Sequence, residues 1–252
     1  FNNMIPAMLT IIIFSLVSFG LYAAFKTDLI TLITTMIQEP LRKINTSLIG
    51  TVLIYSFGNF LFTFGIHQTV VNGTILEPLL LVNMNENMAA AAAGKEIPHI
   101  INSTFVPTFG MMGGTGSTIC LLIAAFIFFR KNQQYNELSK LAVAPGIFNI
   151  NEPVIFGFPI VFNLPMMIPF VLTPAIGIIV AYFATAIGFM NKCTVLVPWT
   201  TPPLLNGFLA TGGDFRAIIV QLVIIVIGVL LYLPFMKISE KVSREQAEAM
   251  NN

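Results

Sequence analysis

Charge is scarce in this chain: only 9% of its 252 residues are Asp, Glu, Lys or Arg, whereas soluble domains carry about 25%. A soluble domain of this size needs polar groups to cover its surface, so this scarcity excludes an ordinary globular protein. The formal net charge of +1 gives no support for a nucleic-acid partner. The chain instead has 56% hydrophobic residues, arranged in long apolar runs that are typical of an integral membrane protein.

Cysteine is equally scarce. Cys120 and Cys193 lie far apart, without a CxxC motif or metal-ligand spacing, so we interpret both as small apolar residues rather than redox or phosphocysteine groups. We therefore expect neither a metal nor a cofactor. The chain begins with Phe1, and no signal-peptide pattern precedes the first apolar run, so we expect an internal or C-terminal piece of a longer protein.

Five apolar segments are long enough to cross a hydrocarbon core of about 30 Å, which requires roughly 20 helical residues. They are residues 4–25, 48–71, 105–129, 161–189 and 215–236. Three further apolar stretches are shorter or interrupted by Pro and Gly: 74–93, 141–160 and 194–212. Irregular backbone at membrane depth must be buried in protein or line a wet cavity, so we predict re-entrant hairpins or half-helices there. The expected fold class is an all-α membrane protein.

The basic residues predict an orientation. If only the five long segments cross, nine basic residues face one side: Lys26, Arg42, Lys43, Arg130, Lys131, Lys140, Lys237, Lys241 and Arg244. Three face the other side: Lys95, Lys192 and Arg216. The positive-inside rule identifies the richer side as cytoplasmic, which places the C-terminus inside the cell.

The segment NINEPVIFGFP, residues 149–159, holds a carboxylate, Glu152, between long apolar stretches. A charge at membrane depth costs roughly 2.5–3.5 kcal/mol on insertion scales, so it needs a partner. Pro153 restricts the preceding residue to extended backbone, which ends a helix and frees polar groups there. A carboxylate accepts hydrogen bonds from hydroxyls, and Asn151 beside it both donates and accepts, which suits a sugar. The alternative is a structural glutamate held by amides at a helix N-terminus.

Five other polar or aromatic residues are candidates for the same cavity. His67, in FGIHQTVVNG, either binds a ligand or is an interfacial histidine near a helix end, and Asn72 nearby favours a cavity. Glu77 repeats the carboxylate-before-proline pattern and Glu86 belongs to a polar cluster; for both, cavity lining and helix capping stay open. Trp199, the single tryptophan, is either an interface anchor or a platform for a pyranose ring.

The glycines of FGMMGGTGST, residues 109–118, do not form a phosphate-binding loop, because no lysine follows them. We predict that they allow close packing or bending of helices.

The segments INEPVIFGFPIVFN, FGIHQTVVNG and PWTTPPLLNGFLATGGD resemble the membrane-spanning IIC component of bacterial phosphotransferase-system sugar permeases, in the lactose/cellobiose/chitobiose branch. The similarity runs through the whole chain in order and corresponds to the C-terminal half of the family. The resemblance implies that His67 and Glu152 hydrogen-bond the sugar near the hydroxyl that is phosphorylated. It also implies that Trp199 lies near the disaccharide.

As a function, the resemblance implies a carrier subunit of a phosphoenolpyruvate-dependent system in the bacterial plasma membrane. Such a carrier binds a β-linked disaccharide of the cellobiose, diacetylchitobiose or lactose type and presents it to a phosphocysteine on a separate cytoplasmic IIB protein. The chain has no phosphoryl-carrying residue of its own, so its standing as an enzyme is open. The implied assembly is a homodimer formed through the N-terminal half of the family, which this chain lacks.

The domain organisation that we expect has four parts. Residues 1–25 form a transmembrane helix, 26–47 an amphipathic helix in the membrane interface, 48–236 a transport domain with the substrate site, and 237–252 a polar cytoplasmic tail. Two other functions stay open. One is a proton-coupled secondary sugar transporter that uses Glu152 or His67 as its relay; the other is a structural membrane subunit without transport activity.

Overall fold

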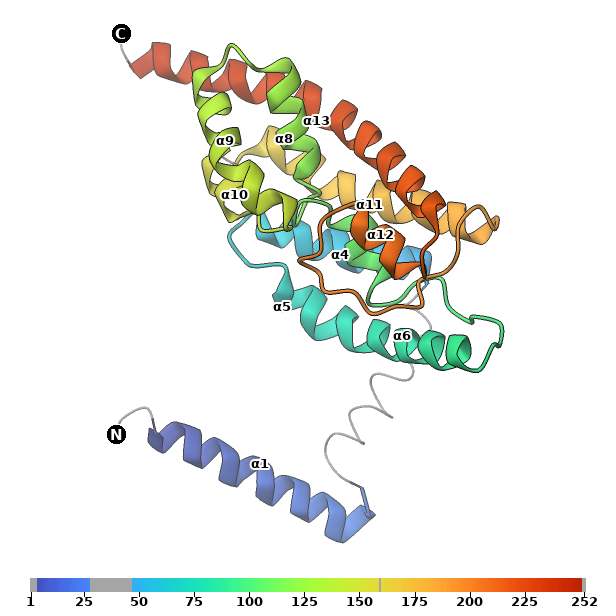
Figure 1. Ribbon diagram of the computed structural model, residues 1–252. Coiled ribbons are helices and arrows are strands. Elements are labelled where there is room, and N and C mark those ends of the chain that lie inside the picture. Colours follow the sequence, from blue (N-terminus) through green and yellow to red (C-terminus); the bar gives the residue numbers. More distant parts are fainter. Residues whose placement is uncertain (1–3, 28–46, 159, 251–252) are drawn as a thin grey trace. The chain divides into compact units, whose positions relative to one another are not determined.

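The computed structural model describes residues 4–27, 47–158 and 160–250, and every regular element in these ranges is a helix (Figure 1). The chain forms two compact units, Phe1–Asn45 and Thr46–Asn252. In the first unit, α1 runs from Met4 to Phe25, with the bounds that its apolar run predicts. Its 22 residues extend about 33 Å, enough to cross a bilayer core. The predicted interfacial helix at 26–47 lies almost entirely outside the described residues.

The second unit is organised around two long helices, α11 (Leu164–Ala186) and α13 (Phe215–Met250). They pack side by side in the most extensive helix–helix contact of the chain (Figure 1). With α1, they are the three helices among the described residues that are long and apolar enough to cross a membrane. This agrees with the predicted all-α membrane class. Helix α13 extends through Met250, so the described part of the predicted polar tail continues this helix.

The apolar segment 48–71 is not one continuous helix. Helix α4 (Leu48–Phe62) starts at Ser47, whose side chain accepts a 3.1 Å hydrogen bond from the Gly50 amide, and ends after 15 residues. Gly65 then adopts φ +86°, a left-handed conformation that glycine reaches without a steric penalty, and the chain turns back. The return consists of α5 (Thr69–Val71), a π-helix η2 (Asn72–Leu76) and α6 (Glu77–Ala92).

The segment 105–129 is also divided, into α7 (Phe105–Gly110) and α8 (Ile119–Phe128). Gly113, Gly114 and Gly116 interrupt the helix because their φ angles are +76°, +99° and +80°. The close packing predicted for this glycine run is confirmed: a Cβ on Gly114 would lie 2.3 Å from Cγ of Asn151. The same glycines therefore allow close contact and break the span.

Two of the three interrupted stretches, 141–160 and 194–212, consist of short helices and irregular backbone, as predicted, whereas 74–93 is continuous helix formed by the end of η2 and by α6. Helix α9 (Gln133–Ile147) and α10 (Glu152–Gly157) flank the Asn-Glu-Pro segment, and α12 (Leu205–Ala210) follows a long irregular segment. Two apolar clusters, both of which include residues of α11 and α13, hold these short helices in place. Cys120 and Cys193 are buried, unpaired members of the two clusters, as expected for small apolar residues.

Candidate functional site: a cavity among the short helices

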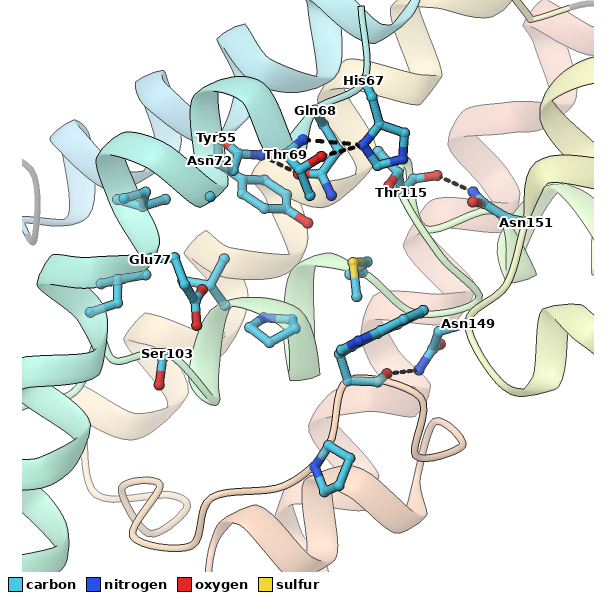
Figure 2. Close-up of a pocket in the computed structure, with 18 of the residues that line it drawn as sticks. Tyr55, His67, Gln68, Thr69, Asn72, Glu77, Ser103, Thr115, Asn149 and Asn151 are labelled. Carbon is cyan, nitrogen blue, oxygen red and sulfur yellow. Dashed lines mark hydrogen bonds between the residues drawn. The ribbon is translucent and has the colours of Figure 1, made fainter. Parts of the chain in front are cut away.

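A cavity of about 680 Å³ lies among the short helices. This volume is within the 300–1,000 Å³ range of small-molecule pockets. Its lining comes from α4, from the turn and helices at 67–80, and from the segments 103–115, 149–152 and 196–199. Figure 2 shows many of these side chains. Two carboxylates and no Lys or Arg belong to the lining that the structure describes, so the cavity suits a neutral polar ligand better than an anion.

His67 lies in the turn between α4 and α5, and its ring packs on Phe62 with 4.6 Å between the ring centroids. The Thr69 amide donates a 3.3 Å hydrogen bond to Nδ1 of His67, and the Thr69 hydroxyl oxygen is 2.6 Å from the same atom (Figure 2). A backbone amide can only donate, so Nδ1 of the neutral ring is an acceptor and the proton is on Nε2. The turn therefore presents an N–H donor, while Thr69 fixes the ring orientation.

Glu152 is the first residue of α10; it is exposed and lines the cavity. Helix α9 ends at Ile147 and α10 begins at Glu152, so residues 148–151 connect the two helices. Contrary to the sequence prediction, Pro153 does not end a helix, because it lies in the first turn of α10, where proline is favoured. The Glu152 carboxylate makes no hydrogen bond or ion pair within the described part of the chain. It lines the same cavity as His67 and Trp199.

The two asparagines of the segment make different contacts. The Asn149 amide donates to the carbonyl oxygens of Trp199 and Thr201, at 2.6 and 2.9 Å, and its Oδ1 accepts a 2.7 Å hydrogen bond from the Gly113 amide. Asn151 donates to the carbonyl of Thr115 at 2.7 Å (Figure 2). Both asparagines are almost fully buried. Their nitrogens thus fasten the α9–α10 connection to the glycine-rich segment and to the Trp199 segment.

Asn72 is the first residue of the π-helix, an element that often marks functional positions. Its amide nitrogen donates to Oε1 of Gln68 at 2.7 Å, whereas its buried Oδ1 has no hydrogen-bond partner in the described residues. Asn72 packs directly on Gly58 of α4, where an added Cβ would lie 2.7 Å from that oxygen. The contact fixes Asn72 at the cavity wall.

Trp199 lies in the irregular segment before α12, and 53% of its surface is exposed. Its backbone carbonyl is held by Asn149, which leaves the indole free to present a face to a ligand.

Of the two remaining glutamate candidates, one lines the cavity in the described structure and the other does not. Glu77 begins α6 and lines the cavity. Glu86 lies further along α6 and is not among the described lining residues; it pairs with Nε2 of His99, a histidine that the motif search did not single out.

Sequence reasoning missed three further residues of the cavity. Asn149 begins the segment 149–159 and has no role predicted from the sequence, although it connects three segments. Tyr55 and Ser103 line the cavity with buried hydroxyls, and neither attracts notice in the sequence, because neither is charged or belongs to a recognisable motif.

Comparisons with known proteins agree with this geometry. A family model described as phosphotransferase system, EIIC, matches residues 1–174. The oligo-beta-mannoside-specific EIIC component of Bacillus subtilis (strain 168) is 37% identical over 253 residues, which cover 98% of this chain and 57% of that protein. The cellobiose-specific EIIC component of Lactococcus lactis subsp. lactis (strain IL1403) is 33% identical, over 98% of this chain and 54% of that protein.

Among solved structures, the chain is similar to the transporter ChbC, the IIC component from the N,N'-diacetylchitobiose-specific phosphotransferase system. The TM-score is 0.81 at 34% sequence identity, over 96% of this chain and 57% of that chain. The chain thus spans somewhat more than half the length of the relatives that it matches.

Proposed function

The chain belongs to the phosphotransferase-system EIIC family, and we propose that it forms the sugar-binding part of a membrane carrier for a β-linked disaccharide. Relatives named for cellobiose, oligo-beta-mannoside and lactose support this substrate class. The observation that carries the proposal is the cavity itself: His67, Glu152 and Trp199 line one space, without a lysine or arginine among its described lining.

The two ionisable groups offer complementary hydrogen bonds to one sugar hydroxyl. A hydroxyl can donate its proton to the Glu152 carboxylate while its oxygen accepts from Nε2–H of His67. The carboxylate polarises the hydroxyl, and the imidazole fixes its position. The hydroxyl held in this way is the one that we expect to receive the phosphoryl group.

The remaining candidate residues have supporting roles. Asn72 forms part of the cavity wall, and Trp199 packs against the apolar face of a pyranose ring. Asn151 offers its Oδ1, because its nitrogen is already bonded to Thr115 and Thr118. Glu77 lines another part of the same cavity.

We expect the phosphoryl donor to lie outside the residues of this sequence. Cys120 and Cys193 are both buried and neither lines the cavity, so this chain offers no exposed thiol to carry a phosphoryl group there. We therefore propose a cytoplasmic IIB partner with a phosphocysteine; the lactose-specific EIICB relatives are named for a IIC and a IIB component together, which supports this pairing. The basic residues near α13's end favour a cytoplasmic C-terminus, and the part of the relatives beyond this chain is where we expect a homodimer contact.

The test is sugar binding by the full-length carrier. We expect Glu152→Gln to raise the dissociation constant for cellobiose roughly ten- to hundredfold, because a hydrogen bond to a charged group is lost. His67→Ala should raise it to a similar or smaller extent. Glu137→Gln, the same change on the exposed side of α9, is the matched control and should bind like wild type.

Wild-type affinity in both Glu152→Gln and His67→Ala would refute the site. An uptake assay separates the proposed function from a proton-coupled transporter: vesicles supplied with the phosphorelay should accumulate sugar phosphate. Accumulation of unmodified sugar that disappears with the proton gradient would favour the secondary transporter instead.

A further inference from the structure

Two buried hydroxyl groups line the cavity without any hydrogen-bond partner. Tyr55 and Ser103 are 4% and 5% exposed, and neither the Tyr55 Oη nor the Ser103 Oγ has a partner in the described residues. Both belong to the cavity lining, together with the Glu77 carboxylate. In Figure 2, Glu77 and Ser103 lie at the end of the cavity away from His67 and Asn151, and the Tyr55 hydroxyl points into the space between.

The local fold explains why these three groups meet. The turn after α4 makes α4 antiparallel to η2 and α6, and the contact between Gly58 and Asn72 sets their register. Tyr55 is one turn before Gly58 on α4, so it faces the end of η2 and the start of α6, where Glu77 lies. Ser103 joins them because its amide donates a 3.1 Å hydrogen bond to the carbonyl of Leu80, one turn beyond Glu77.

A buried hydroxyl without a partner is unfavourable, because its desolvation is not compensated. Tyrosine and serine hydroxyls each donate and accept, and the Glu77 carboxylate accepts, so together they match the hydroxyls of a sugar ring. In the described structure, no hydrogen bond joins these three side chains to the groups that hold His67 or the α9–α10 connection in place. All three residues line the cavity, so a ligand held in it is the partner that we infer for these groups.

We propose that Tyr55, Glu77 and Ser103 form a second sugar subsite, which binds the ring of the disaccharide that is not held at His67 and Glu152. This inference rests on the proposed function, because it assigns the two rings of one ligand to the two ends of the cavity. The His67–Glu152 end selects the hydroxyl for phosphorylation. The Tyr55 end makes the carrier prefer a disaccharide over a single ring.

The experiment compares two probes on the full-length carrier: cellobiose, and methyl β-D-glucoside, which has one ring with a β-linked substituent. Tyr55→Phe and Ser103→Ala should each weaken cellobiose binding roughly three- to tenfold, the effect of one lost neutral hydrogen bond. Binding of methyl β-D-glucoside should stay unchanged. Glu152→Gln should weaken both probes.

Two matched controls test for unspecific effects of the same chemical changes. Tyr182→Phe alters a tyrosine of α11, and Ser139→Ala removes a buried, unpartnered hydroxyl of α9; neither residue lines the cavity. Both should bind cellobiose like wild type. The melting temperature of the sugar-free protein adds a second readout: Tyr55→Phe and Ser103→Ala should melt no lower than wild type, because they remove unsatisfied groups.

Three results would overturn the subsite. Unchanged cellobiose affinity in both variants would show that these hydroxyls do not contact the ligand. Equal losses for both probes would place them at the first ring. A lower melting temperature without sugar would assign them a structural role. If the wild-type carrier binds neither probe, the proposed function itself fails, and the subsite fails with it.

Discussion

Asn149 is the residue whose replacement tests the architecture of the cavity most directly. It is 3% exposed, and its side chain makes three hydrogen bonds to backbone groups of two other segments. Its own backbone has φ +62°, a left-handed conformation that asparagine tolerates better than most residues. We predict that Asn149→Ala destabilises the protein and releases the segment that carries Trp199.

The size of the effect follows from these contacts. Three hydrogen bonds at about 1 kcal/mol each give about 3 kcal/mol, and the left-handed backbone adds about 1–2 kcal/mol for alanine. Asn149→Gly removes the same hydrogen bonds without the backbone strain, so it should be slightly less harmful. Asn149→Asp keeps the acceptor for the Gly113 amide but turns a carboxylate oxygen toward two carbonyl oxygens, so it should also destabilise the protein.

The assay is thermal unfolding of the full-length carrier in detergent, with and without cellobiose. We expect all three variants to melt several degrees below wild type and to bind cellobiose more weakly. Asn191→Ala is the control, because Asn191 is exposed and its side chain makes only a long 3.3 Å hydrogen bond to Arg216 in the described structure. If Asn149→Ala melts and binds like Asn191→Ala, the three hydrogen bonds do not organise the cavity.

Two further predictions concern packing and charge. Gly58→Ala places a Cβ 2.7 Å from Oδ1 of Asn72 and should weaken cellobiose binding roughly three- to tenfold, whereas Gly20→Ala, with open space around it, should not. Hydrogen bonding from Arg216 lowers the pKa of Asp214 to about 2, so this carboxylate stabilises the fold above its ordinary pKa near 4. Asp214→Asn should therefore lower the melting temperature at pH 7, and the difference from wild type should shrink as the pH falls from about 4 toward 2.

The sequence predicts the helices whose apolar runs are uninterrupted. The bounds of α1 and α11 lie within three residues of the predicted segments, because apolar length alone determines them. The segments 48–71 and 105–129 are equally apolar but divided, since Gly65 and Gly113 adopt positive φ angles there. Glycine is also common inside transmembrane helices, so composition does not distinguish a glycine that packs from one that turns the chain.

In the candidate site, too, some residues are predictable from the sequence and others are not. Ionisable residues in apolar surroundings are conspicuous, and His67, Glu77 and Glu152 do line one cavity. Tyr55 and Ser103 are not conspicuous, because tyrosine and serine are common in membrane helices and their lack of partners is a property of the folded chain. The register that brings Tyr55 to Glu77 depends on a turn whose position no local pattern specifies.

The hydrogen bonds around the cavity distinguish polar groups that hold its walls together from polar groups that are available to a ligand. The nitrogens of Asn149 and Asn151 are bonded to backbone carbonyls, so the asparagines of this motif mainly hold Glu152 and the Trp199 segment in position. The Glu152 carboxylate makes no such bond within the described residues. At membrane depth no bulk water compensates an unsatisfied polar group. A hydroxylated ligand therefore gains the most binding free energy at polar atoms of the cavity wall that the fold leaves without a partner. By this criterion we expect the asparagines of the motif to contribute less to sugar recognition than the carboxylate between them.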